Sequence, residues 1–306
     1  MLSYYKTVGG IISPCEGYEK GTWVNLISPS TEELRKVSEE TGVDMQFLLA
    51  PLDEEETSRI ESEEGQTLII VDYPVADKGD TAHYSTFPLG IAVTEDAIIT
   101  ICLKPNDILI EFSSGAVRSV KTTMRTRFVF TLLLRIANKY LHYLRQIDKI
   151  SNMLERQLYK SQRNKELINL LDLQKSLVFF STSLKANEST LEKILRGRIL
   201  RLYEEDQDLL EDVLIEVRQA IEMTNIYSSI LTGTMDAFAS VISNNLNVTM
   251  KMLTSLTIII TIPSIIFGFY GMNIAGLPLT TVWFPITLSA ALMGIASIIL
   301  KRLGLF

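Results

Sequence analysis

The sequence predicts an α+β protein made of an N-terminal mixed α/β cytoplasmic domain, a long helical stalk and two transmembrane helices. Three observations support this prediction. Two stretches near the C-terminus are apolar and uncharged, short β-rich runs alternate with polar residues over about the first 115 positions, and the run from about 208 to 270 contains no proline before Pro263. With 47% hydrophobic residues among 306, the composition fits a soluble part joined to a smaller membrane part.

Residues 1–115 are expected to form the mixed α/β domain. Runs at 23–27, 67–75, 86–93 and 97–103 are rich in β-branched and aromatic residues and predict strands. Ser30 followed by Glu33 is the pattern of a helix capping box and predicts a helix over 30–40. The region has no phosphate-binding loop, Ser/His/Asp order or metalloprotease helix, so the sequence does not predict an enzyme.

Residues 116–206 are expected to form an antiparallel pair of helices. Strand character ends near position 122, and apolar residues then recur at spacings of three and four, which is typical of one apolar helix face: Leu133, Ile136, Tyr140, Tyr143, Ile147, Ile150 and Leu154. A second helical stretch over 164–187 carries its own apolar face: Leu167, Leu170, Leu177 and Leu184. Packing these two faces together favours an antiparallel pair, which ends at a break near Gly197.

Residues 207–251 are expected to form the stalk, as the first part of one helix from about 208 to 270. At 1.5 Å per residue this helix would be roughly 95 Å long. One face repeats apolar residues in a 4-3 pattern that suits packing on the preceding helices. A second face keeps the same spacing, but all its members except Met250 are small or polar: Ser229, Gly233, Asp236, Ser240, Ser243, Asn247, Met250, Thr254, Thr257, Thr261, Ser264 and Gly268. In a membrane such a stripe either packs helices closely or faces water, and its continuation to Asp236 and Asn247 favours water.

Residues 252–306 are expected to form a transmembrane hairpin with spans at 252–270 and 282–300. Each span supplies about 19 uncharged residues, enough to cross a ~30 Å hydrocarbon core as a helix in contact with lipid. Lys251 precedes the first span, Lys301 and Arg302 follow the second, and 271–281 carries no charge. The positive-inside rule therefore places both termini in the cytoplasm of a multi-pass cell-membrane protein. A buried hairpin of a soluble protein is the alternative, and the span lengths and basic flanks disfavour it.

The charge balance and the scarcity of cysteine and histidine narrow the function. A net charge of -7 argues against a nucleic-acid partner and suits a protein that handles cations, although a solvated acidic surface gives the same balance. Cys15, Cys102, His83 and His142 are isolated in the sequence, so no thiolate or imidazole zinc site is predicted. The densest acidic run is by default a solvated loop: Asp53, Glu54, Glu55 and Glu56.

The tripeptide Gly271-Met272-Asn273 follows an aromatic residue and lies between the two C-terminal spans. This motif in this position resembles the CorA family of divalent-cation channels, and the resemblance extends into the long helix before it and, more loosely, into the N-terminal domain. The resemblance implies a homopentamer whose external mouth is formed by the motif, with Asn273 as the selectivity residue and Gly271 and Met272 shaping the turn. The loop at 274–279 differs from many family members because it carries no carboxylate.

The same resemblance implies roles for further residues. Mg²⁺ would be both the transported and the regulatory ion, with Co²⁺ and Ni²⁺ as further candidates. Asp212 and the acidic run Asp53 to Glu56 would supply carboxylates to a regulatory cation site between subunits. The alternative for Asp212 is an acidic residue favoured by the dipole of a helix N-terminus. The ion path would be lined by the polar stripe, with an apolar constriction to which Met250 and Leu253 contribute: Asp236, Asn247, Met250, Leu253, Thr254, Thr257, Thr261, Ser264 and Gly268.

Two other functions remain open at this point. A zinc transporter of the same superfamily would keep the architecture and change the ion. A membrane-anchored coiled-coil scaffold or sensor would use the hairpin only as an anchor. The polar stripe of the first span argues against an anchor, because an anchor needs no polar line through the bilayer.

Overall fold

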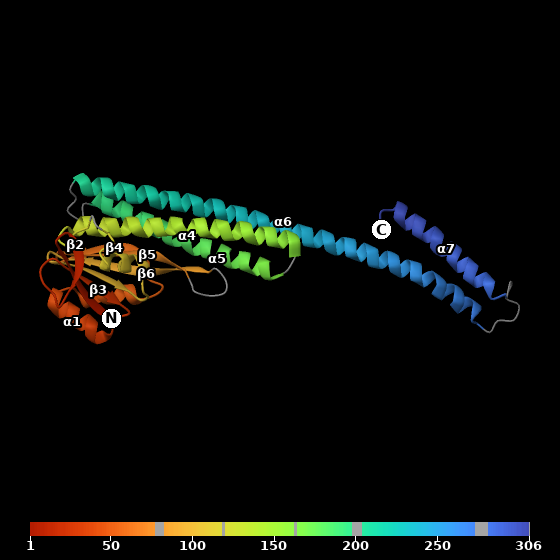
Figure 1. Ribbon diagram of the computed structural model, residues 1–306, viewed down its shortest axis with the longest axis horizontal. Coiled ribbons are helices and arrows are strands. Elements are labelled where there is room, and N and C mark those ends of the chain that lie inside the picture. The colour runs from red at the N-terminus through yellow and green to blue at the C-terminus, as the bar shows by residue number, and fades with distance from the viewer. Residues whose placement is uncertain (77–82, 118–119, 162–163, 198–203, 273–280, 306) are drawn as a thin grey trace. The chain divides into compact units, whose positions relative to one another are not determined.

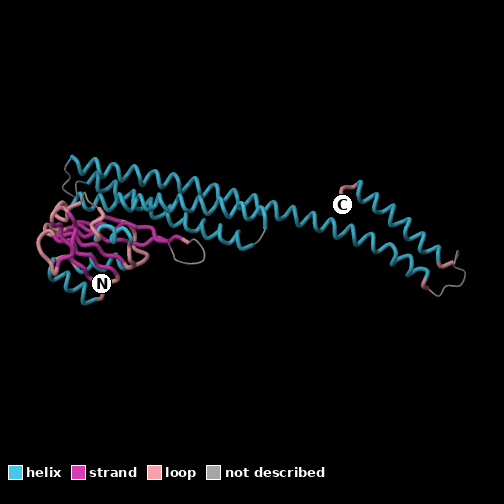
Figure 2. The backbone as a smooth tube through the Cα atoms, viewed as in Figure 1, coloured by secondary structure: helices cyan, strands magenta, loops and turns pink. Residues whose placement is uncertain are grey.

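The computed structural model describes residues 1–76, 83–117, 120–161, 164–197, 204–272 and 281–305 (Figures 1 and 2). The chain divides into two compact units, Met1–Gly233 and Thr234–Phe306. The predicted combination of a mixed α/β part, long helices and two candidate membrane helices is confirmed. The three boundaries expected from the sequence, after residues 115, 206 and 251, stay a prediction.

A seven-stranded sheet forms the centre of the first unit, in the order β2-β1-β3-β7-β6-β5-β4. Its strands are β1 (Leu2–Val8), β2 (Ile11–Cys15), β3 (Thr22–Ile27), β4 (Arg59–Glu63), β5 (Gln66–Ala76), β6 (Tyr84–Val93) and β7 (Ala97–Cys102). Paired neighbours are antiparallel except β3 and β7, which run parallel with Trp23 opposite Ile98. Every residue of β7 is buried, as expected for a strand covered on both faces of the sheet.

The sequence predicted β3, β5, β6 and β7 but not β1, β2 and β4. The two edge strands are β2 and β4, and each has a sequence that a central strand could not tolerate. Pro14 in β2 has no backbone N–H to donate, which is acceptable only where a strand has a free side. Three of the five residues of β4 are charged, and the strand is largely exposed. Edge strands of this kind lack the apolar alternation by which a strand is recognised in a sequence.

One face of the sheet is covered by α1 (Thr31–Thr41), α2 (Met45–Leu49) and the short 3₁₀ turn η1 (Ala50–Leu52). Their apolar side chains pack on inward-facing strand residues in a continuous core: Val24, Leu26, Leu34, Val37, Phe47, Leu48, Leu68, Ile70, Ile99 and Ile101. The η1 turn approaches β6 so closely that a Cβ at Gly90 would collide with Pro51. Glycine at this position therefore lets the turn pack on the strand.

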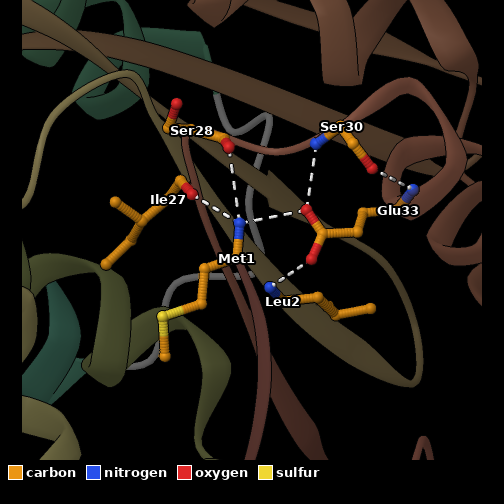
Figure 3. Close-up of polar contacts among 6 residues, drawn as sticks. All are labelled: Met1, Leu2, Ile27, Ser28, Ser30 and Glu33. Carbon is orange, nitrogen blue, oxygen red and sulfur yellow. Dashed lines mark hydrogen bonds and ion pairs between the residues drawn. The ribbon is translucent and has the colours of Figure 1, made fainter.

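The capping box predicted at the start of α1 is present (Figure 3). The Ser30 hydroxyl accepts the backbone N–H of Glu33 at 3.2 Å, and the Glu33 carboxylate accepts the backbone N–H of Ser30 at 2.9 Å. The same carboxylate accepts the Leu2 N–H at 2.9 Å and lies 3.0 Å from the Met1 amino group. These hydrogen bonds, that from the Ser30 N–H above all, hold the pKa of Glu33 below its ordinary value. The box thus joins the helix start to β1 as well as satisfying its own backbone.

The other face of the sheet is covered by α3 (Asp107–Ser113), α4 (Arg125–Ser161) and α5 (Asn164–Gly197). Trp23 on β3 packs edge-on against Phe112 of α3 and at a tilt against Phe128 of α4, at centroid distances of 6.3 and 5.2 Å. The helix pair expected from the sequence is confirmed, and its stripes are buried at Leu133, Tyr140, Leu177 and Leu184 among others. α5 continues past the expected end at 187 because no helix breaker precedes Gly197.

The long helix expected from the sequence is α6 (Glu204–Tyr270), which begins somewhat earlier than position 208. Within the first unit it runs antiparallel to α5. The Gln174 amide donates to the Thr232 hydroxyl at 3.1 Å, and the Arg218 guanidinium bonds the carboxylates of Glu188 and Glu192 at 2.7 and 2.6 Å. Leu210, Leu214, Val217 and Leu231 are buried, so the predicted apolar face of this helix packs as expected here.

Asn187 of α5 makes three hydrogen bonds that join the helix layer to the sheet. Its amide donates to the Asp72 carbonyl at 2.9 Å, and its amide oxygen accepts the Asp72 N–H at 2.9 Å and the Ser58 hydroxyl at 2.8 Å. Asp72 lies opposite Pro88, which has no N–H, and beyond the register in which β4 pairs with β5. The Asn187 side-chain amide therefore bonds the Asp72 backbone in the way that the backbone of a neighbouring strand would.

We expect Asn187→Leu to destabilise this part of the sheet by about 1–3 kcal/mol, because it leaves the partly buried Asp72 N–H without its partner, whereas the Asp72 carbonyl keeps the Tyr140 hydroxyl at 3.1 Å. Native-state hydrogen exchange of the β5 amides measures the loss directly. Asn138→Leu is the matched control, since the Asn138 amide bonds only its own helix and is exposed. Equal protection of β5 in both variants would show that Asn187 has no such role.

Candidate functional site

The second unit contains the C-terminal part of α6 and the helix α7 (Trp283–Arg302), both long and apolar enough to cross a membrane (Figure 1). α6 ends at Tyr270, where the first expected span (252–270) ends, and α7 agrees with the second expected span (282–300) within two residues. Lys251 lies before the first span, and Lys301 and Arg302 end the second. Only a few side chains of either span are buried within the chain, so most of both surfaces are left for lipid or further copies.

One face of α6 packs on α7. Ser255 is 1% exposed and Ile266 is 9% exposed, although most of their neighbours on α6 are open. At one end of the pair the rings of Tyr270 and Phe284 lie 6.1 Å apart, and at the other end Leu300 of α7 is buried. The contact thus runs along the whole pair, on α6 positions separated by three or four residues.

The polar stripe predicted from the sequence lies on the opposite face of α6. Every member within this unit is exposed in the single chain: Asp236, Ser240, Ser243, Asn247, Met250, Thr254, Thr257, Thr261, Ser264 and Gly268. At about 100° per residue, the centre of the stripe is roughly 160° around the helix from the face that packs on α7. The contact between α6 and α7 therefore does not cover the stripe, which stays accessible on the surface of the single chain.

Several hydroxyls of the stripe are bonded to their own helix. Thr257 donates to the Leu253 carbonyl at 2.8 Å, Thr261 to the Thr257 carbonyl at 2.7 Å, and Ser264 to the Ile260 carbonyl at 3.3 Å. Each hydroxyl hydrogen is thus used, whereas the oxygen keeps lone pairs that can accept from outside the helix. The exposed stripe consequently offers acceptors to its surroundings.

Met250 interrupts this polar surface near one end of the span. Its side chain is 52% exposed, and it lies on the stripe between Asn247 and Thr254. Leu253 is 56% exposed but lies about 100° around α6 from Thr254, beside the stripe. The constriction assigned to these two residues stays a prediction.

The turn after the first span is described only at its start. α6 ends at Tyr270, and the Gly271 N–H donates to the Phe267 carbonyl at 2.8 Å. A Cβ at Gly271 would come within 3.0 Å of that carbonyl oxygen, which explains why the smallest residue follows the helix. Met272 is exposed. Asn273, the residue expected to select the ion, lies outside the described residues, as does the loop at 274–280.

The acidic run after η1 divides into two kinds of carboxylate. Glu56 forms an ion pair with Arg59, whereas Asp53, Glu54 and Glu55 are exposed. The Asp53 carboxylate accepts the Glu55 backbone N–H at 3.0 Å and thereby shapes the turn. The exposed three are the members of the run that could meet a cation, and the Glu56–Arg59 pair could not be recognised from the acidic pattern alone.

Asp212 is exposed on α6, next to Val213 and Leu214, which are buried. Its carboxylate consequently points away from the helices packed against α6. Among the residues that the structure describes, no group of three or more His, Cys, Asp or Glu is arranged to hold a metal ion within one chain. The single chain does not bring Asp212 and the acidic run together into such a group.

Sequence reasoning missed Ser255. In the sequence it lies between Thr254, a member of the stripe, and Leu256. Its side chain points to the other side of α6 and is buried against α7. Its hydroxyl donates to the backbone carbonyl of Leu305 at 3.0 Å. The sequence feature that could have revealed this contact is a hydroxyl residue one position away from the 4-3 stripe.

Comparisons with known proteins agree over nearly the whole chain. The model of a family described as CorA-like Mg²⁺ transporter protein matches residues 18–302. The cobalt/magnesium transport protein CorA of Methanocaldococcus jannaschii is 30% identical over 295 residues, which cover 92% of this chain and 90% of that protein. The complete structure of the CorA magnesium transporter from that organism matches with a TM-score of 0.82 and 27% identity, covering 99% of this chain and 96% of the other.

A further solved structure shares the fold alone. The cytoplasmic domain of ZntB from Vibrio parahaemolyticus matches with a TM-score of 0.61 and 12% identity, over 80% of this chain and 97% of that domain. The family model, by contrast, spans the sheet, the helix pair, the long helix and both candidate spans. The chain therefore belongs to the CorA family of membrane transport proteins.

Proposed function

We propose that this chain forms a homopentameric channel that admits Mg²⁺ into the cytoplasm and is closed by intracellular Mg²⁺, with Co²⁺ and Ni²⁺ as further permeant ions. The observation that carries the proposal is the exposed polar stripe of α6 on the face opposite α7. Two helices cannot enclose a pore, so several copies must bring their stripes around one axis. The number five comes from the resemblance to the family.

The chemistry of the stripe suits a hydrated cation. Mg²⁺ gives up its water reluctantly, so it travels with a shell whose hydrogens point outward. Those hydrogens need acceptors, and the stripe offers hydroxyl oxygens whose own hydrogens are already used within the helix. Neutral acceptors bind the shell weakly enough to release the ion onward, as conduction requires.

A permeating ion would pass first the mouth and then the constriction. A ring of Asn273 amide oxygens would select the hydrated ion, in a loop with no carboxylate to trap it. At the other end, rings of Met250 and Leu253 would narrow and dry the path between Asn247 and Thr254. A divalent cation gains about 4.6 kcal/mol on crossing 100 mV, twice the ~2.3 kcal/mol per charge, so no other energy source is needed.

Regulation would depend on carboxylates that a single chain leaves exposed. Asp212 and the exposed members of the acidic run, Asp53 to Glu55, do not form a metal site within one chain. Between neighbouring copies they would repel one another until a cation neutralised them. Intracellular Mg²⁺ would thus hold subunits together in the closed arrangement, and its loss would loosen them.

Flux into liposomes tests the function. The full chain is reconstituted with an entrapped magnesium-sensitive dye and compared with a zinc-sensitive dye under the same inward-negative potential. Mg²⁺ entry above that of protein-free liposomes supports the proposal. Zn²⁺ entry without Mg²⁺ entry would favour a zinc transporter, and entry of neither ion would favour a membrane-anchored scaffold.

Asn273→Ala should reduce Mg²⁺ entry at least about tenfold while the oligomer stays assembled, because the described part of the turn and its uncharged sequence offer no substitute ligand. Liposome flux and size-exclusion chromatography in detergent measure the two properties. Asn244→Ala is the matched control, since Asn244 is exposed and lies off the polar stripe. Normal flux through an assembled Asn273→Ala protein would remove Asn273 from the selectivity site.

Asp212→Lys should weaken the protection that Mg²⁺ gives against proteolysis, because the lysine ammonium replaces the cation in the regulatory site. Limited digestion with and without Mg²⁺, followed on gels, measures the protection. Asp208→Lys makes the same charge change at an exposed position one turn earlier and should retain protection. If both variants behave like the parent, Asp212 serves only the acidic start of the helix.

Met250→Gly should leave a conducting pore at millimolar internal Mg²⁺, with flux on the order of tenfold above the closed parent, because removing the side chain wets the ring. Met252→Gly is the matched control. Met252 is also exposed, at 61% against 52%, and lies about 200° around α6 from Met250, so it carries the same helix penalty without facing the path. A Met250→Gly channel that still closes like the parent would place the gate elsewhere.

A further inference from the structure

The hydrogen bond between Ser255 and Leu305 links the beginning of the first span to the turn after the second. The Ser255 hydroxyl donates to the Leu305 carbonyl at 3.0 Å, and Ser255 is 1% exposed. The two residues are fifty positions apart in the sequence. This bond closes the end of the helix pair that carries Lys251 and Lys301, opposite the end at Gly271.

The Ser255 bond differs from the other hydroxyl bonds described in this unit. Seven serine and threonine hydroxyls here donate to the carbonyl four residues earlier in their own helix: Ser240, Thr249, Thr257, Thr261, Ser264, Thr287 and Ser297. The same local acceptor position exists for Ser255. Its hydroxyl instead crosses to the second helix, so the bond fixes the two helices relative to each other.

The turn after α7 presents the Leu305 carbonyl for this bond. Gly304 has φ +67, and its N–H donates to the Lys301 carbonyl at 3.2 Å, while the Leu305 N–H donates to the Leu300 carbonyl at 3.1 Å. These two bonds form a Schellman motif, which satisfies carbonyls of the last helical turn. The Leu305 carbonyl lies beyond the helix and obtains its partner from Ser255.

The other described contacts between α6 and α7 are apolar or aromatic. Ile266 and Leu300 are buried apolar residues, and the rings of Tyr270 and Phe284 lie 6.1 Å apart. Such contacts resist rotation through the shapes of the side chains, but apolar burial itself is non-directional. A hydrogen bond from a fixed position on the helix has a preferred direction, so Ser255 determines which side of α6 faces α7.

We propose that the Ser255–Leu305 bond is a rotational lock that keeps the polar stripe of α6 turned away from α7 and toward the ion path. Ser255 is thus a positioning residue for the path, and it touches no ion. The inference rests on the proposed function for its consequence in closure, whereas the rotational setting itself can be measured without ion flux.

Cysteine labelling measures the rotational setting. Thr254 and Leu256 flank Ser255 and lie about 200° apart around α6. In a Cys15→Ser background, with Cys102 buried, a membrane-impermeant thiol reagent applied to the open oligomer should label Thr254→Cys faster than Leu256→Cys. Adding Ser255→Ala should reduce the ratio of the two labelling rates roughly fivefold, because the net free energy of one hydrogen bond corresponds to about that factor in an equilibrium. Ser297→Ala removes a hydroxyl bonded within α7 and should leave the contrast unchanged.

A second variant separates the lock from local packing. A Cβ added at Gly304 would have no atom within 4 Å, so Gly304→Ala causes no steric conflict. Alanine disfavours φ +67, however, so this variant should lose the turn that presents the Leu305 carbonyl. Gly304→Ala should reduce the labelling contrast as Ser255→Ala does, and the double variant should be no worse than either. Effects that multiply in the double variant, or an unchanged contrast in Ser255→Ala, would overturn the lock.

The same variants also show whether the channel closes. Residual Mg²⁺ flux at millimolar internal Mg²⁺ should rise roughly fivefold in Ser255→Ala and Gly304→Ala and stay at the parental level in Ser297→Ala. A parent that shows the labelling contrast but conducts no divalent cation would contradict the proposed function and leave the lock standing. A regulated parent whose contrast and closure are both unaffected by Ser255→Ala would contradict the lock alone.

Discussion

A polar surface inside an apolar layer has to meet water or another polar surface, and the rest of the membrane unit depends on this constraint. The hairpin buries one side of α6 on α7 and leaves the hydroxyl stripe on the other side exposed. Lipid offers that stripe no partner. The proposed assembly of several copies around an aqueous axis would satisfy it, so the distribution of residues around one helix supports an oligomer.

The same constraint explains why hydroxyls, rather than carboxylates, line the span. A serine or threonine can use its hydrogen on its own helix and still present an oxygen, as Thr257 and Thr261 do. A carboxylate would carry a full charge into the apolar layer. In this chain the exposed acidic side chains Asp53, Glu54 and Asp212 lie in the first compact unit. In the proposed channel, selection of the ion and sensing of the ion would thus use different chemistry in different parts of the chain.

Much of this arrangement could be predicted from the sequence because it depends on periodicity. The 4-3 spacing along α6 separated its two faces, and the Ser30 and Glu33 pair marked the start of α1. The edge strands β2 and β4 were missed because Pro14 and the charges of β4 are tolerated only at an edge, which is a property of the sheet and not of the segment. The pairing of Ser255 with Leu305, and of Asn187 with Asp72, joins positions that no local pattern relates. Asn273, identified from its motif, lies outside the described residues.

The Asn187 bonds also bear on how this protein can be divided. Because a helix side chain completes the hydrogen bonding of β5, removing α5 would expose both an apolar sheet surface and the Asp72 N–H that Asn187 accepts. A fragment that stopped after the last strand would present an open edge beside a bare hydrophobic face, the combination from which β-sheet aggregates grow. The shortest fragment that stays soluble should therefore include the helices as well as the sheet.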